Sequence, residues 1–246
     1  NIQREGVTIE AGEIILQNVS FINTHPDGRV ANGGGGCGFW YSTKSTDENT
    51  VSFIDCHFED TFYHGKDHTK YGGGAISIQS VSTCNFYIKI TGCRFYNCYT
   101  SQNNGGAIAI MTQKSVQIEN CYFENCRIEE NNGDYKGGSI FINQSLLSNQ
   151  FNLINITVNS SISSTDFTAF DFECASCPKF VIESCNFINC KTRNYIKSSY
   201  NVVSCPETVQ LFECRNSNFL FDEKGDANPR VFQVHTPSFT FDNCAF

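Results

Sequence analysis

Cysteine is the residue type of this chain with the widest chemistry, because a thiol can form a disulfide, bind a metal or act as a nucleophile. Six of the 14 cysteines recur in pairs with one spacing: Cys93 and Cys98, Cys121 and Cys126, Cys185 and Cys190. If these segments stack on one another, Cys93–Cys121 and Cys98–Cys126 come within disulfide distance. The alternative is a column of buried free thiols, in which cysteine packs as a small hydrophobe. Both alternatives are open from the sequence.

A further cysteine pair has a different spacing. Cys174 and Cys177 form a C-x-x-C motif directly before Pro178. Zinc and redox chemistry both use this spacing, but a zinc site needs a second pair of ligands, and none is evident. A local disulfide or a position in the core are the other interpretations. The cysteines that we predict as disulfide candidates are therefore Cys93, Cys98, Cys121, Cys126, Cys174, Cys177, Cys185 and Cys190.

Histidines gather in one polar segment. His57, His64 and His68 lie near Asp60 and Asp67 in the sequence. The spacing of His64 and His68 suits a metal site on a helix, but this stretch reads as a loop between strands. We interpret it as a solvated polar loop and predict neither a metal nor a cofactor.

Composition limits the cellular setting and the partners. The net charge of −8 argues against nucleic acid and against an anionic membrane as partners. No apolar run approaches the roughly 20 residues of a membrane span, so we expect no membrane insertion by this chain. Asn-x-Ser/Thr triplets favour secretion, although they also arise by chance in a chain rich in Ser and Asn. The predicted glycosylation sites are Asn18, Asn143, Asn155 and Asn159.

One repeat runs along the whole chain and would position these side chains. Its anchor position i is occupied by Val19, Cys56, Cys93, Cys121, Ile156, Cys185, Ser217 and Cys244. Positions i−5, i−3 and i+2 are apolar in every copy, whereas position i+1 is mostly polar. Alternation with period two predicts short β-strands before and after the anchor.

Side chains at i−5 and i−3 face inward, and so do those at i and i+2. Because i−3 and i are three residues apart, strict alternation is broken between them, which requires a bend at i−2 or i−1. Position i−1 holds Asn, Asp, Gly or Ser in every repeat, and Asn, Asp and Gly tolerate the left-handed backbone that a sharp corner needs. Asparagines stacked at such corners can hydrogen-bond from one repeat to the next.

A third strand, opened by paired glycines, precedes this pair in segments 73–78, 105–110 and 137–142. Three strands in a repeat of about 30 residues describe one coil of a solenoid. We therefore predict an all-β, right-handed, single-stranded parallel β-helix of the pectin-lyase-like type, with about seven or eight coils. Residues 1–246 form one domain. Because the chain starts without Met, we expect a mature product or a fragment of a longer chain.

The motif Gly-Gly-Ala-Ile, together with Phe-x-Asn-Cys at 95–98, 123–126 and 187–190, resembles the repeat of the polymorphic outer-membrane proteins of chlamydiae. It is also similar to related surface proteins of protists such as trichomonads. The resemblance is sharpest over 73–126, 137–142 and 185–190. It implies a parallel β-helix displayed outside the cell, with adhesion as its role. The bacterial motif is Phe-x-x-Asn, whereas here Asn stands one place earlier.

Carboxylates are candidate catalytic groups, because many parallel β-helices cleave polysaccharides. Such enzymes use two carboxylates across a groove, or Asp-bound Ca²⁺ with a basic residue. The outward residues near the anchors are Asp55, Glu59, Arg94, Glu119, Glu124 and Glu183, and Glu59 shares a column with Glu124. An exposed acidic face is ordinary for a chain of this charge. A polysaccharide lyase or glycoside hydrolase is therefore an alternative, and we expect no enzyme.

Insertions between repeats fall at 24–36, 42–49, 61–72, 127–136 and 191–204, mostly after the i+2 strand, so they should leave the rod on one side. Loops gathered on one face of a solenoid often bind ligands. We expect a non-catalytic, cysteine-rich surface or secreted glycoprotein that adheres to a glycan or protein of a host or neighbouring cell. The alternative is a structural subunit that self-associates through the open ends of its β-helix.

Overall fold

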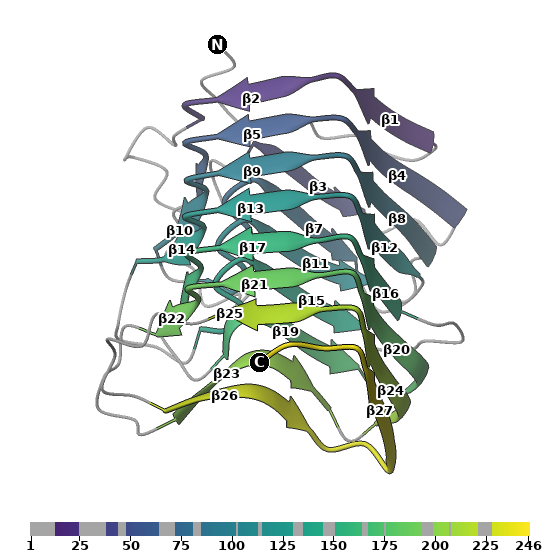
Figure 1. Cartoon of the computed structure of the whole chain (residues 1–246). Helices are drawn as coiled ribbons and strands as arrows, with labels where there is room; N and C mark the ends of the chain where they lie inside the picture. Colours follow the sequence, from purple (N-terminus) through teal and green to yellow (C-terminus); the bar gives the residue numbers. More distant parts are fainter. Residues whose placement is uncertain are drawn as a thin grey trace.

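The computed structural model describes residues 13–24, 38–43, 48–63, 72–80, 85–101, 103–112, 115–129, 135–144, 151–163, 167–174, 176–192, 199–206, 208–220 and 228–246. These residues form four parallel β-sheets and no helix. Strands stack in sequence order down the axis, and the chain winds from sheet to sheet in a right-handed sense (Figure 1). The predicted parallel β-helix is confirmed.

Sheet 1 contains the strand before each anchor. Its members, in stacking order, are β1 (Glu13–Gln17), β4 (Glu48–Ile54), β8 (Asn85–Thr91), β12 (Val116–Glu119), β16 (Phe151–Ile154), β20 (Cys177–Glu183), β24 (Val209–Arg215) and β27 (Ser238–Asp242). Position i−3 pairs with position i−3 of the next coil, as in Leu16 with Phe53 and Ile182 with Cys214. The register therefore follows the sequence columns.

Sheet 2 contains the strand after each anchor. Its members are β2 (Ser20–Ile22), β5 (His57–Glu59), β9 (Arg94–Tyr96), β13 (Tyr122–Glu124), β17 (Thr157–Asn159), β21 (Asn186–Ile188) and β25 (Asn218–Leu220). The central residue of each three-residue strand is the apolar i+2 residue, which points inward. Phe58 stacks on Phe95 with ring centroids 5.0 Å apart, and Phe95 stacks on Phe123 at 4.5 Å. This ladder of rings forms the centre of the core.

Sheet 3 was not predicted, and it makes four strands per coil rather than three. Its two-residue strands are β6 (Phe62–Tyr63), β10 (Tyr99–Thr100), β14 (Arg127–Ile128), β18 (Ile162–Ser163) and β22 (Lys191–Thr192). A second corner at i+4 creates them. The residues at that corner all have a left-handed backbone: Asn23, Asp60, Asn97, Asn125, Ser160 and Asn189.

Sheet 4 contains the predicted glycine-led strand. Its members are β3 (Phe39–Thr43), β7 (Ile76–Ser80), β11 (Ile108–Thr112), β15 (Ile140–Gln144), β19 (Phe167–Cys174), β23 (Ser199–Cys205) and β26 (Asn228–Val234). The two glycines before this strand are required for different reasons, one for its backbone conformation and the other for close packing between coils. Gly105 has a φ of +75°, and a Cβ on Gly106 would lie 2.0 Å from the carbonyl oxygen of Gly138 in the next coil. A side chain is therefore disfavoured at Gly105 by the backbone and at Gly106 by the next coil.

The predicted corner at i−1 is also confirmed. Its residues all have positive φ: Asn18, Asp55, Gly92, Asn120, Asn155, Ser184, Asn216 and Asn243. The expected hydrogen bonds between stacked corners are present, since Asn155 Nδ2 donates to Asn120 Oδ1 at 2.8 Å and Asn243 Nδ2 donates to Asn216 Oδ1 at 2.8 Å. Backbone ladders therefore join each coil to the next, and corner side chains add to them where Asn stacks on Asn.

Candidate functional site

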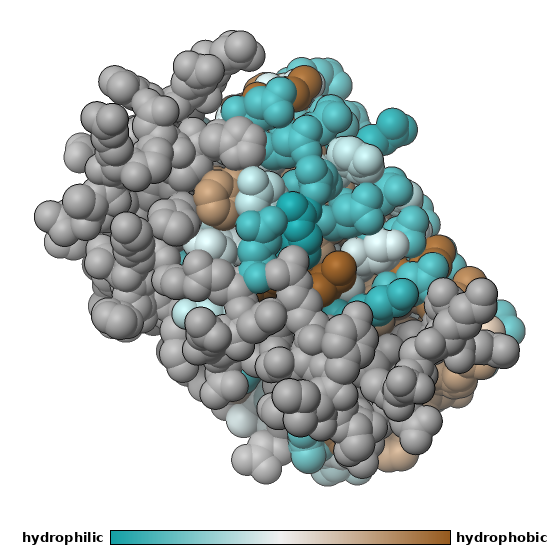
Figure 2. Space-filling model, turned by 90° about the vertical axis from the view of Figure 1, so that its left-hand side faces the viewer, coloured by the Kyte–Doolittle hydropathy of each residue, from teal (hydrophilic) through white to brown (hydrophobic). Residues whose placement is uncertain are grey.

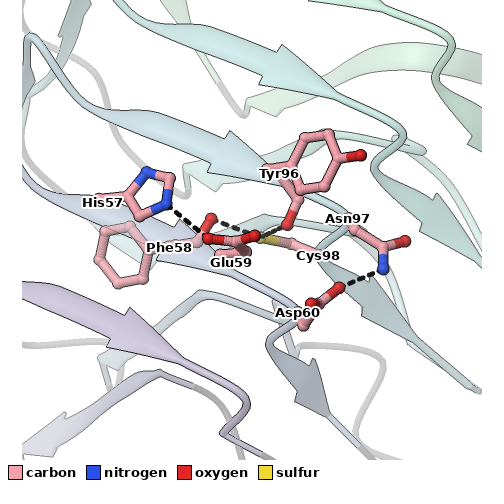
Figure 3. A network of polar contacts seen from close by, with 7 residues as sticks. All are labelled: His57, Phe58, Glu59, Asp60, Tyr96, Asn97 and Cys98. Atoms are coloured by element: carbon pink, nitrogen blue, oxygen red, sulfur yellow. Dashed lines mark hydrogen bonds and ion pairs between the residues drawn. The ribbon is translucent and has the colours of Figure 1, made fainter.

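The cysteine columns lie at the two corners of each coil. Cys93 donates its thiol proton toward two carbonyl oxygens, of Phe53 in the preceding coil at 3.6 Å and of Thr91 at 3.5 Å. Cys98 does the same at the second corner, toward the carbonyl oxygens of Phe58 and Tyr96 (Figure 3). Cysteine therefore serves these positions by being small, apolar and able to hydrogen-bond to the corner backbone.

All eight cysteines predicted as disulfide candidates are free thiols in the structure. Burial raises the pKa of Cys185 and of Cys190 to about 12, so both thiols are protonated and poor nucleophiles near neutral pH. The pKa of Cys93 is also raised to about 12, chiefly by its hydrogen bond to Cys121. Bridging between stacked coils depends on the surrounding oxidant and stays a prediction.

Cys174 and Cys177 lie at the corner where sheet 4 passes to sheet 1. Cys174 ends β19 and is half-buried, whereas Cys177 begins β20 and is fully buried. Among the described residues, no group of three or more His, Cys, Asp or Glu side chains is placed to hold a metal ion. The two cysteines of the C-x-x-C motif are brought together by the short corner between β19 and β20.

The histidine segment is described only in part. His57 Nε2 lies 3.0 Å from Glu59 Oε2 on the same strand, and both side chains are about a third exposed. Asp60 instead contacts Asn97 of the next coil (Figure 3). His64, His68 and Asp67 lie outside the described residues. Within the described part, His57 and Asp60 therefore have separate partners.

The candidate carboxylates are divided between two sheets. Glu119 and Glu183 end strands of sheet 1, whereas Glu59 and Glu124 project from sheet 2. Glu59 and Glu124 both pair with Tyr96, which lies on the coil between them. That separates their backbones by about 10 Å along the axis. Each is also bound on its own strand, Glu59 to His57 and Glu124 to the Tyr122 hydroxyl at 3.0 Å.

The remaining outward candidates stand on and beside sheet 2. Asp55 is an exposed corner residue with a φ of +52°. Arg94 is exposed on β9, between His57 of the preceding coil and Tyr122 of the next. Both therefore contribute charge to a surface rather than to an enclosed site.

The outer surface of sheet 2 is the most varied polar surface described. We call it the sheet 2 face, made of His57, Glu59, Arg94, Tyr96, Tyr122 and Glu124. Tyr96 is 40% exposed and Tyr122 is 38% exposed, so aromatic rings reach solvent among charged groups. Exposed rings beside hydrogen-bonding groups suit ligands that are partly apolar and partly polar.

A ladder of polar side chains continues this surface around the second corner. Asp60 accepts a hydrogen bond from Asn97, whose Oδ1 accepts one from Arg127. The Arg127 guanidinium carbon lies 4.4 Å from the centre of the Tyr99 ring, and the same group binds Glu129 Oε1 at 2.9 Å. We call Asp60, Asn97 and Arg127 the corner ladder. The described surface on this side is mainly hydrophilic, with a few apolar patches (Figure 2).

Most of the predicted insertions leave the rod along one line. The insertions predicted at 61–72, 127–136 and 191–204 include the strands β6, β14 and β22 of sheet 3, and the last of them also includes most of β23. The last described residues before the gaps in four insertions all lie in or directly beside the path of sheet 3: Thr24, Tyr63, Glu129 and Thr192. The chain is next described at or just before a strand of sheet 4 in each case. The insertions themselves are mostly outside the described residues. Their points of departure nonetheless lie beside the corner ladder, not on the side of sheet 1.

The predicted glycosylation sites differ in accessibility. Asn18 and Asn155 are exposed corner residues, although Asn155 uses its Nδ2 to bind Asn120. Asn159 is half-buried at the outer end of β17. Asn143 is also half-buried, and its Nδ2 donates to Glu173 Oε2 at 2.9 Å. Glycosylation at any of these sites stays a prediction.

Comparisons with family models, with curated proteins and with solved structures found no match to this chain. In the described part of the chain, no helix has the length and apolar character needed to cross a membrane. The class defined by the fold is that of cysteine-rich parallel β-helix proteins.

Proposed function

We propose that this protein is a non-catalytic, extracellular β-helix that binds a glycan or protein of a host or neighbouring cell. The binding surface is the sheet 2 face with the corner ladder and the insertions that depart beside it. The observation that carries this proposal is the shared line of departure of those insertions, because it combines variable loops with a rigid, polar and aromatic surface on one side of the rod.

The chemistry of the surface supports recognition rather than turnover. Several of its charged groups are bound to neighbours, as in His57 with Glu59 and Arg127 with Glu129. Such pairs fix side chains in position and leave hydrogen-bonding atoms and tyrosine rings facing outward. Pre-positioned groups of this kind reduce the entropy that a ligand must lose on binding. The sequence resemblance to displayed surface proteins, and the glycosylation motifs, favour an extracellular location.

The test is binding of the purified chain to glycan arrays and to intact cells. We expect binding to fall at least roughly tenfold in a Tyr96→Ala, Arg127→Ala double variant. The two substitutions remove side chains from the binding surface and leave the core residues unchanged. A Lys89→Ala variant is the matched control, since Lys89 is exposed on sheet 1, outside the proposed binding surface. Absence of binding above background in every assay would overturn the proposal.

A structural role is the second candidate, and one observation favours it. Phe239 is 61% exposed, Phe241 38% and Phe246 66%, so the last coil presents an apolar surface along the helix axis. A second molecule stacked on this end would bury these rings. Concentration-dependent association of the chain, reversed by Phe239→Ser, would support this role. Release of reducing or unsaturated ends from acidic polysaccharides would instead support the enzyme alternative.

A further inference from the structure

The corner between β19 and β20 holds a pair of thiols unlike those in the stacked columns. Cys174 is one of only two described cysteines that are not fully buried, the other being Cys244. Its partner in the C-x-x-C motif, Cys177, is fully buried. The two thiols hydrogen-bond to each other. One sulfur is thus open to reagents while its neighbour is shielded.

Thr208 of the next coil anchors the outer thiol. Its hydroxyl lies 3.2 Å from Cys174 Sγ and also donates to the Cys174 carbonyl oxygen at 2.7 Å. Cys177 Sγ donates toward the Lys179 carbonyl oxygen at 3.2 Å. These contacts orient the two sulfurs within one rigid corner.

The electrostatics of the pair are asymmetric. The hydrogen bond from Cys177 lowers the pKa of Cys174, and Thr208 acts in the same direction against the effect of burial. The same hydrogen bond, with burial, raises the pKa of Cys177. Of the two thiols, Cys174 is therefore the easier to deprotonate, and it is also the one that reaches solvent, as in a reactive dithiol with one attacking and one resolving thiol.

We propose that Cys174 and Cys177 form a redox-reactive dithiol, in which Cys174 attacks small disulfide compounds and Cys177 resolves the product. This inference does not rest on the proposed binding function. Its substrate class is a low-molecular-weight disulfide such as glutathione disulfide.

The reaction balances in two exchange steps. The Cys174 thiolate attacks one sulfur of the small disulfide, the S–S bond breaks, and one small thiolate leaves and takes up a proton. Cys177 then gives its proton to solvent and attacks Cys174 Sγ, which releases the second small thiol. The two protein thiols are oxidised to one disulfide, and the small disulfide is reduced to two thiols.

The first experiment is timed alkylation of the folded, reduced chain, read by peptide mass mapping. We expect Cys174 to react at least about tenfold faster than the buried Cys93 or Cys190, which need local opening to react. Cys244 is the comparison that separates the effect of solvent exposure from that of an activated thiol, because it is also only half-buried. Cys174 should also react faster than Cys244. Equal rates at Cys174 and Cys244 would overturn the assignment of Cys174 as the attacking thiol.

The second experiment is incubation with glutathione disulfide, again read by peptide mapping. We expect a Cys174–Cys177 disulfide in the wild-type chain and an accumulating glutathione adduct on Cys174 in the Cys177→Ser variant. Cys174→Ser should leave Cys177 reduced, and Cys190→Ser is the matched control that should react as wild type does. A first disulfide formed elsewhere would overturn the proposal. The alkylation rates of the wild-type chain decide the matter if a variant fails to fold.

Discussion

The backbone N–H of Cys185 donates a hydrogen bond to Ser217 Oγ in the next coil, with a nitrogen–oxygen distance of 3.1 Å. The same hydroxyl donates to the Arg215 carbonyl oxygen at 2.8 Å. The left-handed residue before the anchor interrupts the sheet, so the N–H of Cys185 bonds to a side chain of the next coil instead of to a backbone carbonyl. This explains why Cys and Ser are frequent in a column that otherwise belongs to the apolar core.

Replacing Ser217 by Ala should leave the buried N–H of Cys185 without its acceptor. We expect a loss of about 1–3 kcal/mol in the free energy of unfolding, measured by urea denaturation. Ser217→Cys should recover most of that loss, because a thiol occupies this position in five other coils. Equal losses in the two variants would mean that side-chain volume, not hydrogen bonding, governs the column.

Replacing Asn155 by Ala should strain the corner, because Asn155 has a φ of +53°. The left-handed backbone costs a residue with a Cβ about 1–2 kcal/mol. Asn155→Gly removes the bond to Asn120 but keeps the backbone relaxed, so it should cost less than Asn155→Ala. Urea denaturation of both variants measures the difference. A glycine variant as unstable as the alanine variant would assign the effect to the lost hydrogen bond.

Phe95 is fully buried between the rings of Phe58 and Phe123. Phe95→Ala should therefore lower the free energy of unfolding by about 3–5 kcal/mol, since the stacked rings cannot close the cavity. The adjacent Tyr96→Ala is the control, because Tyr96 points outward and should cost about 0.5 kcal/mol or less. Similar losses at both positions would contradict the inward and outward assignment of β9.

Asp171 introduces a dependence of stability on pH. Burial raises its pKa to about 7, with Glu173 acting in the same direction and Lys136 opposing. The folded chain holds this proton more tightly than the unfolded chain, so the stabilising effect is complete below about pH 4 and is lost as pH rises through about 7. The full effect is at most roughly 4 kcal/mol.

Unfolding measured at pH 5 and at pH 8 tests this dependence. We expect the free energy of unfolding of the wild-type chain to fall from pH 5 to pH 8, and Asp171→Asn to remove most of that fall. The variant should therefore compare more favourably with the wild-type chain at pH 8 than at pH 5. Asp242→Asn is the control, since Asp242 is an exposed carboxylate at the end of β27 and does not act on Asp171. A decline in Asp171→Asn as steep as in the wild-type chain would assign the pH dependence to other groups.

The sequence was sufficient to predict the fold because columns of equivalent residues repeat along the whole chain. The pairing of Phe58 with Phe95 and of Phe95 with Phe123 follows directly from those columns. The corner at i−1 could be predicted for a similar reason, since the inward side of the chain changes phase there. Both signals survive wide variation in the lengths of the insertions.

The second corner and sheet 3 could not be predicted from alternation, because a two-residue strand is too short to show a period. A signal was nevertheless present. Asn97 and Asn125 are each followed by cysteine, as the anchor Cys121 is preceded by Asn120. This pair of a left-handed residue and a small inward residue marks both corners. In the bacterial family motif the Asn stands one place later, whereas here its position meets the backbone requirement of the second corner.

The candidate surface was harder to predict than the fold. Glu59 and Glu124 share a column, but only the structure shows that each is bound to a neighbour on its own strand. The asymmetry of Cys174 and Cys177 was likewise hidden, because it depends on Thr208 from another coil. Spacing along the chain can identify such residue types, whereas their chemistry depends on burial and on contacts between coils.

The common departure line of the insertions separates two kinds of sequence change. Residues in the columns must match their neighbours above and below, so a substitution there disturbs the packing of the adjacent coils. An insertion beside sheet 3 can lengthen, shorten or change its composition without shifting the register of any strand, because the coil closes again in sheet 4. The architecture therefore tolerates new loop sequences on that side while the residues in the columns stay the same.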